Sequence, residues 1–594
     1  MAINTTRDDE DLKESIKKDV LKRLFSHLLG YKKEIVKVTL LIIVNTAVGV
    51  SYPLLIQRII DVEIVNKDIG GLLIFVGIAL MLALINMAAS RIWRGMMADV
   101  SNDVVYIIRR NLYIHIQKLG VDFFDSRPAG KILARVTGDV NSLKDVLSST
   151  ITMLIPEILT LLGVIAAMLV VSPLLTLSAA VAIPVIVVGV LICEILAEKK
   201  WQLFRKKDSN MTAFVHENLA GMAIVQSFNA QEETEVEMAE VTEEHRIAFR
   251  GAVRVCDCFS PAVEISYGVG AFLLYYLAIK VLKVDFDSVG ILTAFTMYLG
   301  MFIGPVRNLA NYYNKLVTNI SAAERIFEIM DIEPSVKDAE NAEIMPQIKG
   351  EVEFKNVAFA YPDEPDKLIL KDVNFKVNPG ETIALVGPTG AGKTTIVSLI
   401  SRFYNCTEGK VMIDGKDIAN VTIESLREQL GIMTQDNYLF SGTIKENLKY
   451  GKQDATDEEI IRAAKAVHAH NFIMKLEKGY DTEMSERGGG LSIGQKQLIA
   501  FARTLVQDPG ILILDEATSN IDTNTEIMVQ RGIEEMLKQR TSFIVAHRLS
   551  TIRNADRIFV IDDGGILEAG NHEELMKLKG AYYKLYSSMD LKVS

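Results

Sequence analysis

This sequence contains few cysteines and has no excess of positive charge. The 594 residues include only four cysteines, which are Cys193, Cys256, Cys258 and Cys406. Their spacing does not match a zinc site, and the Cys256-x-Cys258 pair is better explained as incidental at a helix start than as a pair of metal ligands. Acidic residues outnumber basic ones, and the net charge is −11, so no basic surface for nucleic acid is expected. The composition therefore argues against a zinc protein and against a nucleic-acid partner.

The first 34 residues do not have the pattern of a cleavable signal peptide, because they are polar and charged. They contain one amphipathic stretch, from Val20 to Leu29. This stretch could lie along a membrane surface or pack on the protein, and both alternatives stay open at this point. Residues 1–34 are therefore expected to form a cytosolic N-terminal segment.

Hydrophobic residues make up 49% of the chain, and they gather in long runs in its N-terminal half. Six segments are close to the ~20 residues that a bilayer core requires. They run approximately over residues 38–57, 72–90, 150–171, 174–193, 259–279 and 289–306. Six such runs in a row are not expected of buried helices in a soluble domain. The sequence therefore predicts six membrane-spanning helices.

The connections between these segments predict their orientation. Two connections, 91–149 and 194–258, are long and rich in Lys and Arg, which places them in the cytoplasm. An even number of spans then returns the C-terminal half to the same side. The long connections are expected to be helical extensions of the spans, each with a break at its tip. The breaks are expected at Phe123-Phe124-Asp125 with the following Pro128 to Gly130, and at Glu217 to Gly221.

A phosphate-binding loop is present in the C-terminal half. The run Gly387-Pro388-Thr389-Gly390-Ala391-Gly392-Lys393-Thr394 fits the pattern G-x-x-x-x-G-K-[ST], and it lies between a predicted strand and a predicted helix. The glycines allow the backbone N–H groups to surround phosphate oxygens, and the helix N-terminus adds a positive dipole end. Lys393 would reach the β- and γ-phosphates, and the Thr394 hydroxyl would ligate Mg²⁺. The loop therefore predicts binding of a nucleoside triphosphate.

Two further motifs follow this loop. Residues 511–514 are an apolar run that ends in Asp515 and Glu516, which is typical of a buried parallel strand with acids at its ligand-binding end. Asp515 suits the Mg²⁺ shell through water, and Glu516 suits positioning or deprotonating the attacking water. Residues 491–495 precede an apolar helical face, so Ser492 and Gly494 are expected at a helix N-terminus. This is a second anion-binding position that the phosphate loop itself does not need.

Together these motifs resemble the nucleotide-binding domain of ABC transporters, over roughly residues 350–585. The resemblance implies ATP and Mg²⁺ as cofactors. The implied nucleotide-binding residues are Tyr361, which stacks on adenine, and Gly387, Pro388, Thr389, Gly390, Ala391, Gly392, Lys393, Thr394 and Thr395. The implied catalytic residues are Glu516, His547 and Gln435, and the implied metal-binding residues are Thr394, Gln435 and Asp515. The implied signature residues, which contact the ATP of a partner subunit, are Ser492, Ile493, Gly494 and Gln495, and Asp522 belongs to the D-loop.

The resemblance also implies a second ABC half-transporter as partner, because two such domains dimerise head to tail in that family. The two long connections resemble the intracellular loops of ABC exporters, whose short coupling helices dock on the nucleotide-binding domains. One position departs from the family pattern, since Ile493 stands where the commonest signature has glycine. A branched residue restricts the backbone and close approach to a phosphate. A complete hydrolytic half-site with an altered signature resembles one partner of the family's asymmetric heterodimers, so we favour a heterodimer over a homodimer.

We expect a multidomain protein, with an all-α polytopic membrane domain followed by an α/β P-loop ATPase domain. The expected parts are an N-terminal segment (1–34), a transmembrane domain (35–325), a linker (326–349) and a nucleotide-binding domain (350–594). The expected activity is ATP hydrolysis that drives export of a lipophilic or amphiphilic solute, drug-like or lipid, across a bacterial plasma membrane, with both termini in the cytoplasm. The alternative is an ATP-gated channel or regulatory ABC membrane protein. That alternative predicts a degraded glutamate after Asp515 or an added regulatory segment, and the sequence has neither.

Polar residues inside the spans are the candidates for substrate contact, because burying them in lipid is costly. Glu264 is the first choice, since it lies in an otherwise apolar span and could receive a cationic amphiphile. Tyr267 and Tyr298 are further candidates. Each of the three could instead serve hydrogen bonding between helices.

Overall fold

The computed structural model describes residues 18–281, 289–434, 438–515, 523–546 and 552–593. Its contacts divide the chain into two compact units. The first consists of Met1–Gln117 and Ala129–Ile332, and the second of Lys118–Pro128 and Glu333–Ser594. A short stretch from between two membrane-spanning helices is therefore part of the C-terminal unit.

The first unit is helical throughout its described residues. Six of its described helical segments are long and apolar enough to cross a membrane, which is the number that hydropathy predicts. The helices are α1 (Lys18–Ser26), η1 (His27–Tyr31), α2 (Lys32–Arg58), η2 (Ile59–Ile64), α3 (Ile69–Lys118), α5 (Ala129–Ala134), η3 (Arg135–Asp139), α6 (Val140–Ser149), η4 (Thr150–Leu154), α7 (Ile155–Val171), α8 (Pro173–Ala220), α9 (Met222–Ser227), α10 (Gln231–Tyr276), η5 (Leu277–Val281), α11 (Val289–Gly300) and α12 (Ile303–Asp331).

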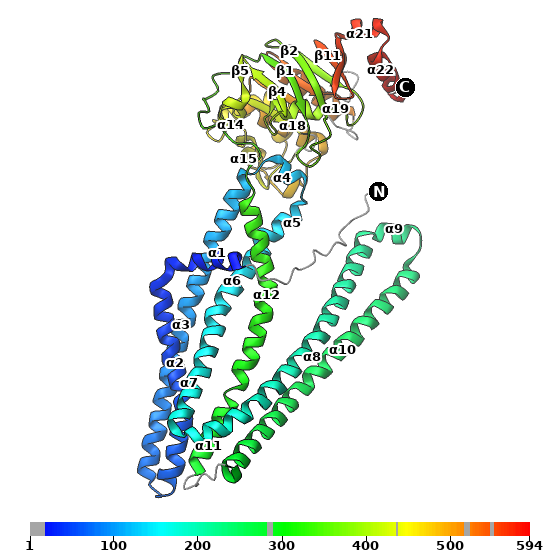
Figure 1. The fold of residues 1–594 in the computed structure, drawn as a ribbon. Helices are drawn as coiled ribbons and strands as arrows, with labels where there is room; N and C mark the ends of the chain where they lie inside the picture. Colours follow the sequence, from blue (N-terminus) through cyan, green and yellow to red (C-terminus); the bar gives the residue numbers. More distant parts are fainter. Residues whose placement is uncertain (1–17, 282–288, 435–437, 516–522, 547–551, 594) are drawn as a thin grey trace. The chain divides into compact units, whose positions relative to one another are not determined.

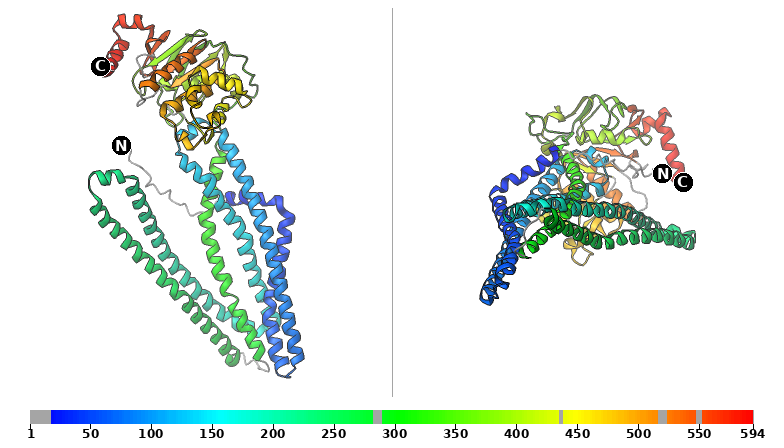
Figure 2. Two further views of the ribbon diagram at one scale, coloured as in Figure 1. Left: turned by 180° about the vertical axis from the view of Figure 1, so that it is seen from behind. Right: turned by 60° about the horizontal axis from the view of Figure 1, so that its bottom comes forward.

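Three of these helices run far beyond the apolar segments. At 1.5 Å per residue, α3, α8 and α10 are each roughly 70 Å long, which is about twice the thickness of a bilayer core. The helices α8 and α10 lie side by side, and α9 connects them at the tip of the pair (Figures 1 and 2). The break before α9 falls at Gly221, as predicted, and the long connections are extended helices and not separate domains.

The amphipathic stretch at the N-terminus packs on the protein. Leu24 and Leu28 are buried. The Arg23 Nη1 donates to both carboxylate oxygens of Asp331, at 2.7 and 2.8 Å. The Arg23 guanidinium also lies 4.4 Å from the ring centre of Phe327. The helix α12 continues past position 325, where the membrane domain was expected to end, because Ile326 and its apolar neighbours remain buried on one helical face.

The second unit contains the β-structure of the chain and one short helix, α4 (Val121–Asp125), from the N-terminal half. Its strands are β1 (Val352–Phe359), β2 (Leu370–Val377), β3 (Thr382–Val386), β4 (Glu408–Ile413), β5 (Lys416–Asp417), β6 (Leu430–Met433), β7 (Gly442–Thr443), β8 (Glu483–Met484), β9 (Ile511–Asp515), β10 (Thr541–Val545), β11 (Arg557–Asp562) and β12 (Gly565–Gly570). Its longer elements besides α4 and the strands are α13 (Lys393–Ile400), α14 (Ile423–Arg427), α15 (Ile444–Lys449), α16 (Asp457–Ala466), α17 (His470–Ile473), α18 (Ile493–Val506), α19 (Thr523–Leu537), α21 (His572–Leu578) and α22 (Ala581–Val593).

A six-stranded sheet organises this unit, with the order β12-β11-β3-β10-β9-β6. Its strands are parallel except for β12 at one edge. The strand β3 is buried along its whole length, and successive side chains enter two different cores. Ile383 and Leu385 join the core shared with β1, whereas Ala384 and Val386 join the core under α18. Burial on both faces explains why this strand is a continuous apolar run in the sequence.

Candidate nucleotide site

The predicted phosphate loop and the predicted Mg²⁺ carboxylate lie at one edge of the six-stranded sheet. Leu385 pairs with Val545, and Val545 pairs with Asp515, all in parallel register. The loop leaves β3 directly after Val386, and Asp515 is the last residue of β9. Because neighbouring strands are about 4.8 Å apart, the two strand ends are separated by about 10 Å. The sheet therefore places both motifs at its carboxyl edge, where ligands bind in such folds.

Glycines shape the loop at positions where other residues would be strained. Gly387 and Gly392 have φ angles of +151° and +104°, and a Cβ atom on either would meet Ile561 O at 2.1 Å or Leu370 Cδ2 at 2.7 Å. Gly390 also has a positive φ of +85°, yet a Cβ there meets nothing within 4 Å. The first two glycines therefore allow close packing of the loop, and Gly390 is needed for its backbone conformation alone.

Lys393 opens α13 and points back into the loop. Its side chain is 8% exposed, and its Nζ donates to the carbonyl oxygens of Gly387 and Pro388 at 2.8 Å each. Burial lowers the pKa of Lys393, and the negative charge of Asp515 opposes that shift. An ammonium group held inside a ring of backbone dipoles is suited to binding the terminal phosphates of a nucleotide.

The two threonines after Lys393 have different surroundings. Thr394 is exposed at the start of α13, whereas Thr395 is buried and its Oγ1 lies 3.1 Å from the Tyr361 hydroxyl. A free hydroxyl and a carboxylate at the same sheet edge are oxygen donors of the kind that Mg²⁺ uses together with phosphate oxygens. Thr394 and Asp515 therefore fit the predicted metal role, and the described residues contain no cluster of three His, Cys, Asp or Glu that would form a separate metal site. The predicted role of Thr395 in nucleotide binding is indirect on this geometry, because its hydroxyl contacts Tyr361.

Tyr361 lies in an aromatic cluster beside the loop. Its ring meets Phe359 edge-on at 4.9 Å and Tyr404 edge-on at 5.3 Å between ring centres. It also borders a cavity of about 610 Å³, which is open to solvent. A half-buried ring at the mouth of a cavity can stack on a base, as the predicted role requires.

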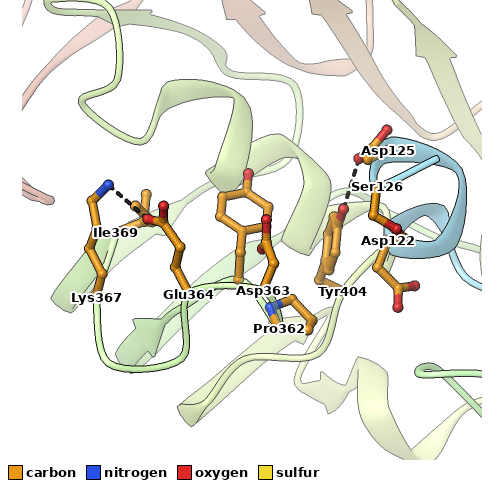
Figure 3. Close-up of a pocket in the computed structure, with 10 residues that line it drawn as sticks. Asp122, Asp125, Ser126, Pro362, Asp363, Glu364, Lys367, Ile369 and Tyr404 are labelled. Atoms are coloured by element: carbon orange, nitrogen blue, oxygen red, sulfur yellow. Dashed lines mark hydrogen bonds and ion pairs between the residues drawn. The ribbon is translucent and has the colours of Figure 1, made fainter. Parts of the chain in front are cut away.

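The helix α4 forms another wall of the same cavity. Asp122, Asp125 and Ser126 line it opposite the segment from Pro362 to Ile369 (Figure 3). The Tyr404 hydroxyl donates to Asp125 Oδ2 at 2.9 Å, and the Ser335 hydroxyl donates to Asp122 Oδ1 at 2.6 Å. Burial raises the pKa of Tyr404 well above its ordinary value, and Asp125 raises it further, so the hydroxyl keeps its proton. Sequence analysis did not single out Tyr404, because no motif marks it and its partner is far away in the chain.

The second predicted anion-binding position is the N-terminus of α18. Ser492 caps this helix, since its Oγ accepts from the Gln495 N–H at 3.3 Å and the Gln495 Oε1 accepts from the Ser492 N–H at 3.0 Å. Gly494 is buried, whereas the side chain of Ile493 is 57% exposed. The two remaining N–H groups of the first turn belong to Ile493 and Gly494, and such groups have no partner inside a helix. The signature residues thus form one contiguous site, with Gln495 acting through the cap.

Several predicted residues lie outside the described part of the chain. They are Gln435, Glu516, Asp522 and His547, so their catalytic, metal-binding and D-loop roles stay predictions. Among the predicted substrate residues, Glu264 is exposed on α10. The hydroxyls of Tyr267 and Tyr298 donate to Thr296 O and Val50 O, both at 3.0 Å, and Tyr298 is fully buried. Both tyrosines therefore connect helices, and the substrate role of all three residues stays a prediction.

A further polar contact within the spans was not predicted as a pair. The Asn308 side chain of α12 donates to Glu157 Oε1 of α7 at 2.5 Å. Sequence analysis could find each polar residue in its apolar segment, but hydropathy does not show which helical faces meet. Glu157 therefore has a hydrogen-bond partner inside the helical unit.

Comparisons with known proteins agree with this arrangement. Residues 35–306 match the ABC transporter transmembrane region, and residues 370–519 match the ABC transporter family of ATP-binding domains. The uncharacterized ABC transporter ATP-binding protein YknV of Bacillus subtilis is 40% identical, over 94% of this chain and 93% of its own length. A fatty acid ABC transporter ATP-binding/permease protein of Mycobacterium bovis is 38% identical, over 86% of this chain and 80% of its own length.

A solved structure is similar to this chain over most of its length. The structure of a bacterial Atm1-family ABC exporter with ATP bound has a TM-score of 0.75 and 28% sequence identity, over 94% of this chain and 98% of its own. Both family matches thus occur in one polypeptide, in the order that the sequence predicts. The chain belongs to the ABC transporters, as an exporter whose membrane-spanning region is fused to an ATP-binding domain that hydrolyses ATP.

Proposed function

We propose that this chain is a half-transporter that couples ATP hydrolysis, at an interface with a second subunit, to export of a lipophilic or amphiphilic solute. The observation that carries the proposal is the position of α4. This helix follows directly on the long helix α3, yet it is bound within the ATPase unit through Asp122 and Asp125. Because α4 directly follows α3, the ATPase unit is joined to a membrane-spanning helix by a short stretch of chain. Such a connection can transmit a conformational change from the nucleotide site to the span.

ATP and Mg²⁺ would be held by residues of the phosphate loop and the sheet edge. Lys393 and the loop N–H groups bind the phosphates, Tyr361 binds the base, and Thr394, Gln435 and Asp515 hold the metal ion. Bound Mg²⁺ would neutralise charge on the phosphate oxygens. Glu516 accepts a proton from the attacking water, and His547 orients the terminal phosphate.

The second subunit would complete the site through its own signature helix. Supporting this, the N-terminus of α18 has an exposed Ser492 and an exposed Ile493, so its first residues can reach a second subunit. We favour a heterodimer over a homodimer, because the β-branched Ile493 restricts approach to a phosphate and the rest of the hydrolytic motif is intact. The helix α9 supports the same assembly, since Leu219, Ile224 and Phe228 at this tip are at least 65% exposed and suit docking on the nucleotide-binding domain of a second subunit.

We place the chain in the bacterial plasma membrane, with both termini in the cytoplasm, because the long connections 91–149 and 194–258 are rich in Lys and Arg. The predicted solute is drug-like or a lipid. A relative described as a fatty acid transporter supports an amphiphile with a long apolar part.

Uptake into inside-out membrane vesicles tests the function. We expect ATP-dependent accumulation of a fluorescent lipophilic cation or of a labelled fatty acid by the wild-type chain. Glu516→Gln keeps the size of the side chain and removes its basicity, so hydrolysis should fall at least about 100-fold and accumulation should stop. Equal accumulation by wild type and Glu516→Gln would contradict ATP-driven export.

A further inference from the structure

Tyr404 lies between Tyr361, which is the predicted base-stacking residue, and α4, which follows the membrane-spanning helix α3. On one side its ring packs edge-on against Tyr361, at 5.3 Å between ring centres and an interplanar angle of 89°. On the other side its hydroxyl donates to Asp125 of α4 at 2.9 Å (Figure 3). Tyr404 is 6% exposed, whereas Asp125 is exposed where it lines the cavity, so the hydrogen bond between them is partly buried. A hydrogen bond to a carboxylate is directional and stronger than one between neutral groups.

The contacts of Tyr361 extend this connection to the phosphate loop. The Tyr361 hydroxyl lies 3.1 Å from Thr395 Oγ1, and Thr395 is in the first turn of α13. Phe359 supports both tyrosines, with ring centres 4.9 Å from Tyr361 and 5.5 Å from Tyr404. A continuous set of packed side chains therefore runs from α13 through Tyr361 and Tyr404 to α4.

The helix α4 is short, so the side-chain contacts that hold it, including the Tyr404–Asp125 hydrogen bond, matter for its position. The helix has five residues, and its N-cap, Gly120, offers no side chain to hold it. Phe123 buries one face, with the Arg127 guanidinium 4.6 Å from its ring centre. Two carboxylates of α4 also accept hydrogen bonds, Asp122 from the Ser335 hydroxyl and Asp125 from the Tyr404 hydroxyl, and only the second of these bonds comes from the aromatic cluster. A shift of the Tyr361 ring upon stacking would move Tyr404 and, through it, Asp125.

We infer that Tyr404 is a positioning residue that transmits occupation of the base site at Tyr361 to α4. This inference rests on the proposed function, since it assigns one contact through which nucleotide binding acts on the membrane unit. It predicts that removal of the Tyr404 hydroxyl separates ATP binding from the response of α4. The tyrosine ring itself should continue to support Tyr361.

Hydrogen exchange of residues 119–128 tests the inference without any transport measurement. The full chain in lipid, carrying Glu516→Gln so that ATP stays bound, is compared with and without ATP. We expect ATP to change the protection of this peptide when Tyr404 is present, and we expect no such change with Tyr404→Phe or Asp125→Ala. The matched control is Tyr480→Phe, because the partly buried Tyr480 hydroxyl also has a side-chain partner, His470 Nδ1 at 2.8 Å, in the same unit. An ATP-dependent change that persists in Tyr404→Phe would overturn the inference.

A double-mutant cycle adds a second readout in transporting vesicles. The ratio of solute transported to ATP hydrolysed should fall about threefold to tenfold in Tyr404→Phe, the size of one typical, partly exposed hydrogen bond. Tyr404→Phe, Asp125→Ala and the double variant should give the same ratio, because all three remove one interaction. The KM for ATP should stay within about twofold of wild type, which separates positioning from binding. Effects that multiply in the double variant would also overturn the inference. Absence of transport in wild type would contradict the proposed function alone, because the exchange measurement would still decide the role of Tyr404.

Discussion

The helices α13 and α18 both begin at a predicted anion-binding position, and they begin in different ways. The N-cap of α13 is Gly392, which has a left-handed backbone and no side chain to cap the helix. The N-cap of α18 is Ser492, which forms a reciprocal cap with Gln495. The first residue of α13, Lys393, is 8% exposed, whereas the first residue of α18, Ile493, is 57% exposed.

This difference predicts which position is complete within one chain. At α13 the chain's own loop supplies glycine backbone and a buried ammonium group. At α18 the helix has its own side-chain cap, and its first residues Ser492 and Ile493 are exposed. On the proposed function, a phosphate at α13 would need no second chain for its first contacts, whereas a phosphate at α18 would come from the partner subunit.

The largest expected effect comes from removing the buried charge at α13. Lys393→Ala should weaken ATP binding about tenfold to 100-fold, because charge-assisted hydrogen bonds to the phosphates contribute about 1.5–3 kcal/mol each. Binding of a fluorescent ATP analogue measures this directly. The control is Lys445→Ala, which removes an exposed lysine that pairs with Asp457 in the same unit. Unchanged ATP affinity in Lys393→Ala would mean that the loop does not bind the nucleotide.

A smaller effect is expected from restoring glycine at the start of α18. Ile493→Gly gives the backbone more freedom near the phosphate. It should raise the ATPase rate of the chain purified alone by about threefold, or about 0.6 kcal/mol of barrier. Ile527→Gly is the control, because Ile527 is also an exposed helical isoleucine of this unit. Fast hydrolysis by the wild-type chain alone, with no gain from glycine, would favour a homodimer over the heterodimer.

The smallest expected effect separates the cap of α18 from its ligand. Ser492→Ala should lower the free energy of unfolding of the ATPase unit by about 1 kcal/mol, as loss of an N-cap does. Thr456→Ala should cost the same, since Thr456 forms the same reciprocal cap with Glu459 on α16. Thermal unfolding and ATPase rates measured together should show equal stability losses, with reduced hydrolysis only in Ser492→Ala. Equal rates in the two variants would indicate that Ser492 has a structural role alone.

The sequence predicted those parts of the site that depend on local backbone chemistry. The phosphate loop requires glycine at Gly387, Gly390 and Gly392 for its own conformation, so the pattern is visible in a single run. Asp515 was predicted for a related reason, because the buried strand before it is apolar on both faces and ends abruptly in acids. The six spans follow from the length of their apolar runs.

Contacts between distant segments could not be predicted in this way. Tyr404 and Asp125 are 279 positions apart, and neither residue belongs to a repeated pattern. Tyr298 is predicted either to contact a substrate or to bond between helices, and only the structure shows that its hydroxyl donates to Val50 O on another helix. Which face of a span meets another helix depends on packing that a single sequence does not encode locally. The contacts that side chains make between the membrane-spanning helices therefore could not be predicted from the sequence.

One measurement tests most directly whether α13 and α18 belong to one site built from two chains. Lys393→Ala inactivates the loop of one chain, and Ser492→Asp places a carboxylate against the phosphate of the other site while keeping a good N-cap. The two variants are inactive separately, and they are mixed before reconstitution. If the site is shared, half of the random dimers have one intact site, so ATP hydrolysis should recover to about a quarter of the wild-type rate. Hydrolysis that stays at the level of the separate variants would show that each chain uses its own α18, which contradicts the account.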